Sequence, residues 1–515
     1  MRVSRHWAKP GKHAKELTLG AQSVSSTEHG RLRWPPLLAV VCVALALRIS
    51  HVMNIAQFEF NDFSAMRGLD RWLQMQIALA VAAGDPLGGE LVAYESGPTY
   101  ALLLGVLYRV VGENWVGPLI IQAILGALVP LLLYGAGRRL ASHRVGLIAA
   151  GLACFYGPAI FHEGLLTKFS LVPVTVSALL CATAAAADSK RHLLWALVTG
   201  ATAAFLVSIR GNVVLVLPVV VAWLAWRHRP TAAAKAILCF GAGFVAVAGP
   251  LALRGTLAAD RGREASLWGI HFYIGTAPWG DGGYVVLPHV RDNVFGHVND
   301  ARKLAERAAG KRLTPAEVSR YWFWRGIEEI RRHPAAYLAL EGRKLQRLLA
   351  PDEQDIFGDD YDTYAPRSVI LRSASLSFGS VAPLALLGIG FVVARRSRAS
   401  WCVAFTMAYA LSLLIFFVTG RYRLVLVPPL LICAAAGLAA LGDLWMARRF
   451  PALIVSLATL ALLSLTATQA RTPDLVRLAI IVGVGLVIPA ALRLFEARPR
   501  TAADGGYAPR VNTIL

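Results

Sequence analysis

Long runs of apolar residues, separated by short basic loops, occupy most of this chain of 515 residues. A transmembrane helix needs roughly 20 predominantly apolar residues, and about twelve of the runs approach that length. They cover residues 37–53, 116–136, 145–162, 169–187, 193–209, 212–226, 236–253, 374–394, 400–419, 424–445, 451–469 and 475–495. We therefore predict an all-α polytopic membrane protein. The pair within 193–226 is the weakest assignment, because each half is short and Arg210 lies between them.

The composition excludes several other classes of protein. Hydrophobic residues make up 56% of the chain and charged residues only 16%, against about 25% charged in an ordinary soluble domain. The net charge of +21 comes from 52 Lys and Arg against 31 Asp and Glu, but these basic residues punctuate apolar runs and form no aromatic-basic platform. We therefore expect membrane lipids as partners and no nucleic acid. All six cysteines lie inside apolar runs without metal-ligand spacing, which argues against disulfides and a zinc site.

The basic residues also predict how the chain is threaded. Five short loops carry at least two basic residues each, and they alternate with loops that carry few. Their basic residues are Arg138, Arg139 and Arg144; Lys190 and Arg191; Arg227 and Arg229; Arg395, Arg396 and Arg398; and Arg448 and Arg449. The positive-inside rule then places both termini in the cytoplasm. If the apolar stretch 98–112 were a further span, every later loop would invert, so we expect it to lie along the outer membrane surface.

Two long segments, 54–115 and 255–372, fall on the outer side in this topology. The first contains a predicted helix that begins at Asp70 and ends near Asp85. The second contains Thr314 as a helix N-cap, Pro315 at the first helical position and Glu317 completing a capping box. Helical spacing continues beyond it, with a break expected near His333 and Pro334.

Charged residues at the outer membrane edge are the candidates for chemistry. Asp70 would sit at the head of its helix, although the simplest alternative is that it serves as an N-cap. Glu163 and Lys168 lie in one short loop, where charges are costly unless solvated or paired. They either face an outer cavity or, in the structural alternative, reach toward the interface.

Three arginines depart from the positive-inside pattern, and one histidine stands apart. Arg210, Arg421 and Arg423 end apolar runs on the outer side, where an arginine can bind a lipid phosphate through two hydrogen bonds. The alternative is contact with lipid headgroups. His271 is considered as a metal ligand, although a lone histidine is more often structural and no metal motif is present.

Several stretches resemble bacterial family-39-like integral-membrane glycosyltransferases, which share the GT-C architecture with protein mannosyltransferases and lipid A aminoarabinose transferases. The resemblance covers roughly residues 37–445. It is carried by LDRWLQMQIALAVAAGD, YESGPTYALLLGVLYRVVG, ASHRVGLIAAGLACFYGPAIFHEGLLTK, LVSIRGNVVLVLP, WGIHFYIGTAPWGDGGY, RRHPAAYLALEGRKLQRLL and TGRYRLVLVPPLL, which follow one another in the family's order.

The resemblance implies an inverting transferase that takes a sugar from a polyprenyl-phosphate donor. Asp70 matches the family's general base, while Asp62 and Asp85 remain alternatives for that role. The developing phosphate charge would be neutralised by the outer cations, which are Lys168, Arg210, Arg421 and Arg423. Glu163 is a second catalytic candidate. Tyr100 and Glu95, in the stretch that resembles the family's outer helix, are further candidates for substrate binding.

The chain departs from the family pattern at two positions. Ser96 stands where the aminoarabinose branch has a lysine, and His271 replaces an asparagine. Some relatives hold a metal ion between a first-loop glutamate and a later histidine, so the resemblance suggests Glu95 and His271 for a divalent metal ion. No other cofactor is expected.

The predicted organisation follows from both kinds of argument. Residues 1–34 form a basic cytoplasmic tail that is no signal peptide, 35–445 the transmembrane catalytic module, 446–496 a C-terminal transmembrane hairpin and 497–515 a second tail. The site would face the periplasm from the bacterial cytoplasmic membrane and act on a lipid, glycan or protein acceptor. Two alternatives stay open, which are a ligase or polymerase of the O-antigen type and a multi-spanning transporter or flippase.

Overall fold

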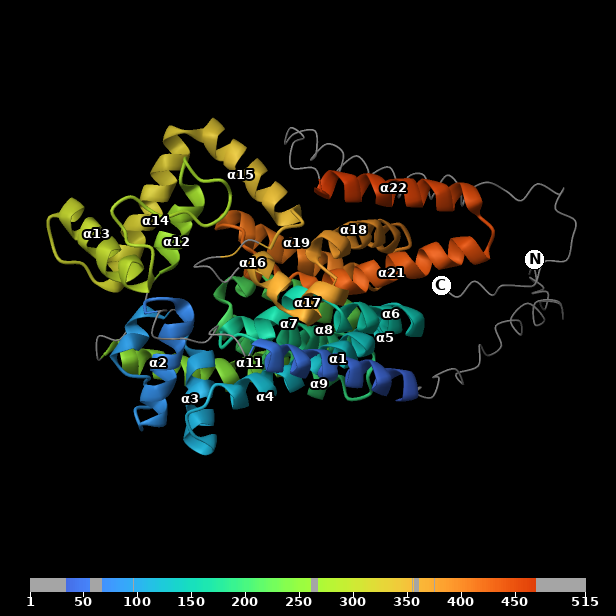
Figure 1. The fold of residues 1–515 in the computed structure, drawn as a ribbon, viewed down its shortest axis with the longest axis horizontal. Coiled ribbons are helices and arrows are strands. Elements are labelled where there is room, and N and C mark those ends of the chain that lie inside the picture. Colours follow the sequence, from blue (N-terminus) through green and yellow to red (C-terminus); the bar gives the residue numbers. More distant parts are fainter. Residues whose placement is uncertain are drawn as a thin grey trace, which may run out of the picture. The chain divides into compact units, whose positions relative to one another are not determined.

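The computed structural model describes residues 34–55, 67–95, 97–260, 267–353, 355, 361–374 and 376–468. All regular elements among these residues are helices (Figure 1), apart from one isolated bridge between Tyr156 and Leu376. The all-α prediction is thus confirmed. Two units can be distinguished, Met1–Ala39 and Val40–Leu515. The second holds every helix beyond the start of α1.

The helices follow one another through most of the described chain. The longer ones are α1 (Trp34–Ile55), α2 (Asp70–Ala82), α3 (Thr99–Val111), α4 (Val116–Ala127), α5 (Val129–Leu140), α6 (His143–Cys154), α7 (Gly157–Glu163), α8 (Val172–Asp188), α9 (His192–Ile209), α10 (Leu217–Arg227), α11 (Pro230–Ala259), α12 (Trp268–Thr276), α13 (Ala301–Ala309), α14 (Pro315–Arg332), α15 (Pro334–Leu349), α18 (Phe378–Ala394), α19 (Ser400–Ile415), α21 (Val427–Met446) and α22 (Phe450–Thr468). Shorter pieces are α16 (Tyr361–Tyr364), α17 (Val369–Ala374) and α20 (Gly420–Arg423).

The apolar helices agree with a multi-pass membrane protein. Six segments of the described chain are long and apolar enough to cross a membrane, namely Pro36–Ile55, Val116–Leu140, Lys168–Asp188, His192–Ile209, Pro230–Ala259 and Val427–Met446. Shorter apolar helices cover most of the other predicted runs. The run predicted at 145–162 is divided between α6 and α7, and the run at 475–495 lies outside the described residues. The count of twelve spans therefore stays a prediction.

Ion pairs connect three of the five basic loops to the ends of α8 and α21. Asp443 near the end of α21 lies 2.7 Å from Arg144 and 3.8 Å from Arg395. Asp188 at the end of α8 lies 2.9 Å from Arg398 and 3.4 Å from Arg227. Each exposed pair contributes little energy, but together they show that loops predicted to share one side of the membrane do lie together.

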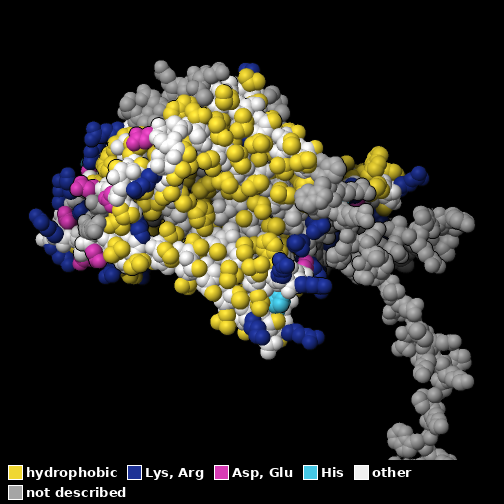
Figure 2. Space-filling model, turned by 90° about the horizontal axis from the view of Figure 1, so that it is seen from below, with side chains coloured by type: hydrophobic (Ala, Val, Ile, Leu, Met, Phe, Trp, Pro, Cys, Tyr) yellow, Lys and Arg dark blue, Asp and Glu magenta, His cyan; other side chains and the backbone are white. Residues whose placement is uncertain are grey.

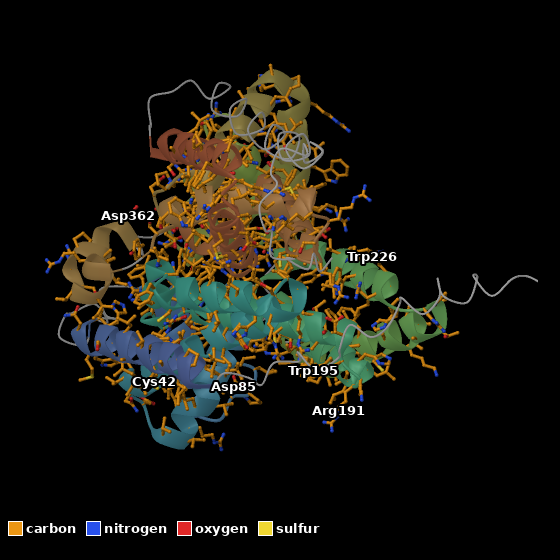
Figure 3. All side chains as sticks on the ribbon, turned by 90° about the vertical axis from the view of Figure 1, so that its right-hand side faces the viewer. Cys42, Asp85, Arg191, Trp195, Trp226 and Asp362 are labelled. Atoms are coloured by element: carbon orange, nitrogen blue, oxygen red, sulfur yellow. The ribbon has the colours of Figure 1, made fainter. Side chains whose placement is uncertain are left out.

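Aromatic side chains mark the same end. Trp195 follows the basic loop before α9, and Trp226 precedes the next basic loop at the end of α10 (Figure 3). Trp226 is 68% exposed, which suits a ring at the membrane–water interface. Figure 2 shows hydrophobic side chains across the middle of one face, with charged side chains gathered to the left and Lys and Arg at the lower right.

The two long outer segments meet at the opposite end. Helices α2 and α3 lie at the left of Figure 1 with α12, α13 and α14, beyond the long helices. The backbone nitrogen of Val294 donates to the carbonyl oxygen of Gly68, 3.0 Å away, and Val294 packs with Leu73 and Ile77 of α2. The turn before α2 is thereby attached to the second outer segment.

The helix boundaries of these segments test the local predictions. Thr314 forms the predicted capping box with Glu317, and α14 gives way to α15 at His333. The N-cap alternative for Asp70 is wrong, because Leu69 is the N-cap residue and no side-chain capping bond is formed. Asp70 is instead the first helical residue of α2.

Candidate active site

The site begins with Asp70, the predicted base. Its Oδ2 atom lies 3.1 Å from Nη1 of Arg421 in α20, and 24% of its side chain is exposed. Arg421 itself is only 3% exposed. The two residues come from opposite halves of the chain, so the packing of α20 against the outer segments brings together a predicted base and a predicted phosphate ligand.

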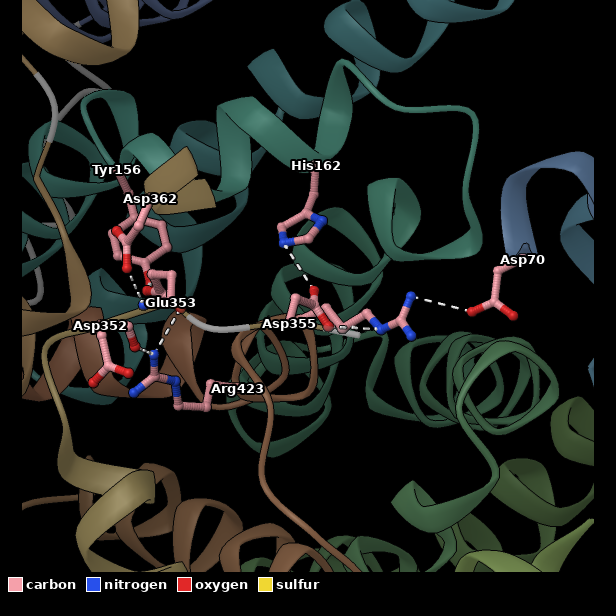
Figure 4. Close-up of polar contacts among 9 residues, drawn as sticks. Asp70, Tyr156, His162, Asp352, Glu353, Asp355, Asp362 and Arg423 are labelled. Carbon is pink, nitrogen blue, oxygen red and sulfur yellow. Dashed lines mark hydrogen bonds and ion pairs between the residues drawn. The ribbon is translucent and has the colours of Figure 1, made fainter. Parts of the chain in front are cut away.

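Arg421 also contacts a second carboxylate. Its Nε atom lies 2.9 Å from Oδ1 of Asp355, whose side chain is 1% exposed. The other oxygen of Asp355 lies 4.0 Å from Nε2 of His162 in α7. Figure 4 shows the resulting line of polar groups from His162 through Asp355 toward Asp70.

Arg210 lies over the same aromatic rings as Arg421, and among the described residues it forms no ion pair with a carboxylate. Its guanidinium carbon is 3.9 Å from the ring centre of Tyr422 and 5.4 Å from that of Phe169. The corresponding distances for Arg421 are 6.0 Å and 4.8 Å. Arg210 donates to the hydroxyl of Tyr409 at 3.5 Å, while its buried Nε atom has no hydrogen bond within the described chain. A buried cation without an anion is costly, and an anionic ligand would remove that cost.

Lys168 and Glu95 form a second ion pair near the site. The Nζ atom of Lys168 lies 2.7 Å from Oε1 of Glu95, and the backbone nitrogen of Lys168 donates to the side chain of Gln74. Gln74 in turn donates to Oε2 of Glu95 at 3.3 Å. Both carboxylate oxygens of Glu95 therefore have partners, and Lys168 is partly neutralised.

Two histidines and a tyrosine of the second outer segment also belong to the candidate site. The rings of His271 and His297 lie 6.1 Å apart, edge to face. The hydroxyl of Tyr284 is 2.7 Å from both Nε2 of His297 and Oδ1 of Asp292. Burial lowers the pKa of both histidines, that of His271 to about 3, while the carboxylate of Asp70 acts in the opposite direction on each ring. Burial and the charge of Asp70 thus act in opposite directions on the pKa of both rings.

Three of the predicted residues lie in different surroundings. Arg423 donates to Glu353 at 2.8 Å and to the carbonyl oxygens of Ala350 and Asp352. Glu163 forms a fully buried pair with Arg48 of α1, with Oε2 and Nε 2.5 Å apart. The hydroxyl of Tyr100 donates to Gln122 at 2.7 Å. These contacts favour structural roles, and the catalytic and substrate-binding roles predicted for the three residues stay untested.

The remaining candidates have simpler outcomes. Asp85 accepts hydrogen bonds from the backbone nitrogens of Leu87 and Gly89, so it shapes the loop after α2. Asp62 and Ser96 lie outside the described residues. A search of the described residues finds no group of three or more His, Cys, Asp or Glu that could hold a metal ion. The paired oxygens of Glu95 do not favour the suggested metal site with His271.

Several site residues escaped the sequence analysis. Asp355 follows α15 in a segment without a motif, and Tyr284, His297 and Asp292 lie in a long outer loop. The only indication in the sequence was the density of polar residues in that segment. It does not indicate which of those residues belong to the site.

One stretch of the chain matches a known protein family. The family model described as dolichyl-phosphate-mannose-protein mannosyltransferase matches residues 95–252. The family resemblance is thereby confirmed. The match to the mannosyltransferase family includes Glu95, Lys168 and Arg210, whereas Asp70 and Arg421 lie beyond it. Over residues 95–252 it supports the coarse assignment of the chain as a glycosyltransferase.

Solved structures give weaker likenesses. The archaeal oligosaccharyltransferase AglB from Archaeoglobus fulgidus, in complex with an inhibitory peptide and a dolichol-phosphate, has 14% identity and a TM-score of 0.45 over 88% of this chain and 55% of that one. The chain thus spans about half the length of that protein. ArnT from Cupriavidus metallidurans, bound to undecaprenyl phosphate, has 14% identity and a TM-score of 0.41 over 90% of this chain and 73% of that one. No curated protein sequence matches the chain.

Proposed function

We propose that the protein transfers a sugar from a polyprenyl-phosphate donor to an acceptor hydroxyl on the outer face of the bacterial cytoplasmic membrane, with inversion. The observation that carries this proposal is the position of Asp70. Its carboxylate lies 3.1 Å from the buried guanidinium of Arg421, and the guanidinium of Arg210 lies over the same two rings as that of Arg421, Phe169 and Tyr422. The mannosyltransferase match supports the same reaction class.

The donor phosphate would bind at Arg210, whose buried Nε atom has no hydrogen bond among the described residues. Arg210 and Arg421 can each direct two N–H groups at phosphate oxygens. Lys168, 13% exposed and paired with Glu95, would add a third positive charge. A phosphate is already a fair leaving group, so the main task of these cations is to position it and stabilise its growing charge.

Asp70 would supply the acid–base step. The acceptor oxygen attacks the anomeric carbon from the face opposite the phosphate, and the acceptor proton passes to the carboxylate of Asp70. The bond between the anomeric carbon and the phosphate oxygen breaks, and its electron pair leaves with the polyprenyl phosphate. Attack from the opposite face inverts the anomeric configuration.

The test is the substitution Asp70→Asn, which keeps the size of the side chain but removes the base. We expect the rate of sugar transfer to fall by about 10²–10⁴, while membrane insertion and elution in detergent remain those of the wild type. Asp85→Asn is the matched control, because its amide oxygen can still accept a loop hydrogen bond. Full turnover by Asp70→Asn would contradict the proposal.

A further inference from the structure

The guanidinium group of Arg421 contacts two carboxylates that differ in their solvent exposure. Its Nε atom lies 2.9 Å from Asp355, whose side chain is 1% exposed, as an ion-pair contact without hydrogen-bond geometry, and its Nη1 atom lies 3.1 Å from Asp70, whose side chain is 24% exposed. Water and mobile ions weaken an exposed pair far more than a buried one. The contact with Asp70 is therefore the one that a ligand can replace.

Asp355 lies next to a segment that is firmly held. Arg423, two residues after Arg421, donates to the carbonyl oxygen of Ala350 at 2.6 Å and to Glu353 at 2.8 Å. The hydroxyl of Tyr156 donates to the other oxygen of Glu353 at 3.2 Å. Both arginines of the GRYR sequence thus bind the same stretch after α15. Arg423 holds the stretch in place, and Arg421 is held by it.

Asp70 has the opposite character. It is the first residue of α2 and is not its N-cap, which is Leu69. If Arg421 turns its Nη edge to another anion, no capping role ties the carboxylate to the helix. A carboxylate paired with an arginine is a weaker base than one without that partner. A phosphate group offers more charge and more acceptor oxygens than a carboxylate.

We propose, on the basis of the function above, that Asp355 is a positioning residue for the base. It anchors Arg421 through Nε while the Nη edge passes from Asp70 to the donor phosphate. Donor binding then frees Asp70, so the base becomes active only in the loaded enzyme.

The first test measures binding of undecaprenyl phosphate to the full-length protein in detergent. Asp70→Asn removes the competitor for Arg421, so we expect binding about three- to tenfold tighter than in the wild type. A general base without this second role would leave the affinity unchanged. In an Arg421→Gln background the gain should vanish, which separates competition for Arg421 from simple repulsion between two anions. A gain that persists in that background overturns the proposal, as does the absence of any gain.

The second test measures sugar transfer at saturating donor. Asp355→Asn keeps a hydrogen-bond acceptor but leaves the full charge of Arg421 to Asp70, so we expect kcat to fall about tenfold. Asp355→Glu restores the charge and should recover much of the loss. Glu353→Gln is the matched control, because it removes a buried carboxylate of the same segment that pairs with Arg423 rather than Arg421. Equal losses in both Asn and Gln variants would indicate general damage to the segment and overturn the proposal.

The two proposals fail in different ways. If the wild type transfers no sugar from a polyprenyl-phosphate donor, the proposed function is wrong whatever the binding data show. If the wild type transfers sugar but Asp70→Asn does not tighten binding, the exchange is wrong and the proposed function stands.

Discussion

Lys168 and Glu95 are 2.7 Å apart, and Gln74 of α2 contacts both of them. The pair joins the loop before α8 to the first outer segment, so one contact links a cation predicted to bind phosphate to the helix that begins with Asp70. Glu95 thereby limits the freedom of the ammonium group and reduces its net charge.

This pair predicts a graded response at position 168. Lys168→Met should raise the KM for the donor about tenfold, because a partly buried charged hydrogen bond is worth about 1.5–3 kcal/mol. Lys168→Arg should recover part of the loss. Steady-state rates against donor concentration would measure both. An unchanged KM in Lys168→Met would leave the residue with a structural role only.

Arg210 provides a sharper test of phosphate binding, because its Nε atom lacks a hydrogen bond in the described chain. Arg210→Met keeps much of the apolar contact with Tyr422 but removes the charge. We expect a loss of at least about tenfold in undecaprenyl phosphate affinity and little loss of thermal stability. Arg210→Lys should restore only part of the affinity, since a point charge lacks two parallel donors. Full rescue by lysine would favour a headgroup anchor.

The buried pair of Arg48 and Glu163 decides between two roles for Glu163. Arg48→Met or Glu163→Gln alone should lower the free energy of unfolding by about 3–5 kcal/mol, because each leaves a charge or polar group unpaired inside the protein. The double variant Arg48→Met with Glu163→Leu should regain most of that stability. Thermal unfolding in detergent gives the comparison. If the double variant is stable and transfers sugar, Glu163 has a structural role. If it is stable but inactive, the predicted catalytic role holds.

His271 predicts a pH dependence of stability. Its pKa is lowered from 6.5 to about 3, first by burial and then by the charge of His297. The folded protein keeps the ring neutral, whereas the unfolded chain takes up a proton below about pH 6.5. The stabilisation is therefore complete above pH 6.5 and is lost as the pH falls toward 3. Between pH 7.5 and 5 the wild type should lose about 2 kcal/mol more than His271→Asn, as measured by unfolding midpoints. Equal losses in both proteins would contradict this.

The topology can be tested with two cysteines in a background that lacks the native ones. Ala141 is an exposed residue of the loop after α5, which is predicted to lie inside, and Lys311 is an exposed residue that follows α13. A membrane-impermeant thiol reagent should label Lys311→Cys in intact cells and Ala141→Cys only after lysis. The reverse pattern would invert the scheme.

The amino-acid sequence by itself determined the helical class, most of the apolar helices and the capping box at Thr314, and it predicts the sidedness of the basic loops. These features depend on the order of residues within one segment, because hydrophobic length, loop charge and capping are local properties. It also pointed to Asp70, Arg421, Arg210 and Lys168. The structure brings Asp70 and Arg421 together, and Arg210 lies over the same rings as Arg421.

Only the tertiary structure decided which charged side chains form ion pairs with one another. A charged residue at a membrane edge has the same local sequence whether it binds a ligand or a distant partner. Packing of the helices pairs Glu163 with Arg48 and Arg423 with Glu353, and it brings Asp355 next to Arg421. Burial excludes water from these ion pairs, so the attraction between the two charges is strong only where helix packing brings them into contact. Which charges come into contact is set by helices that lie far apart in the chain.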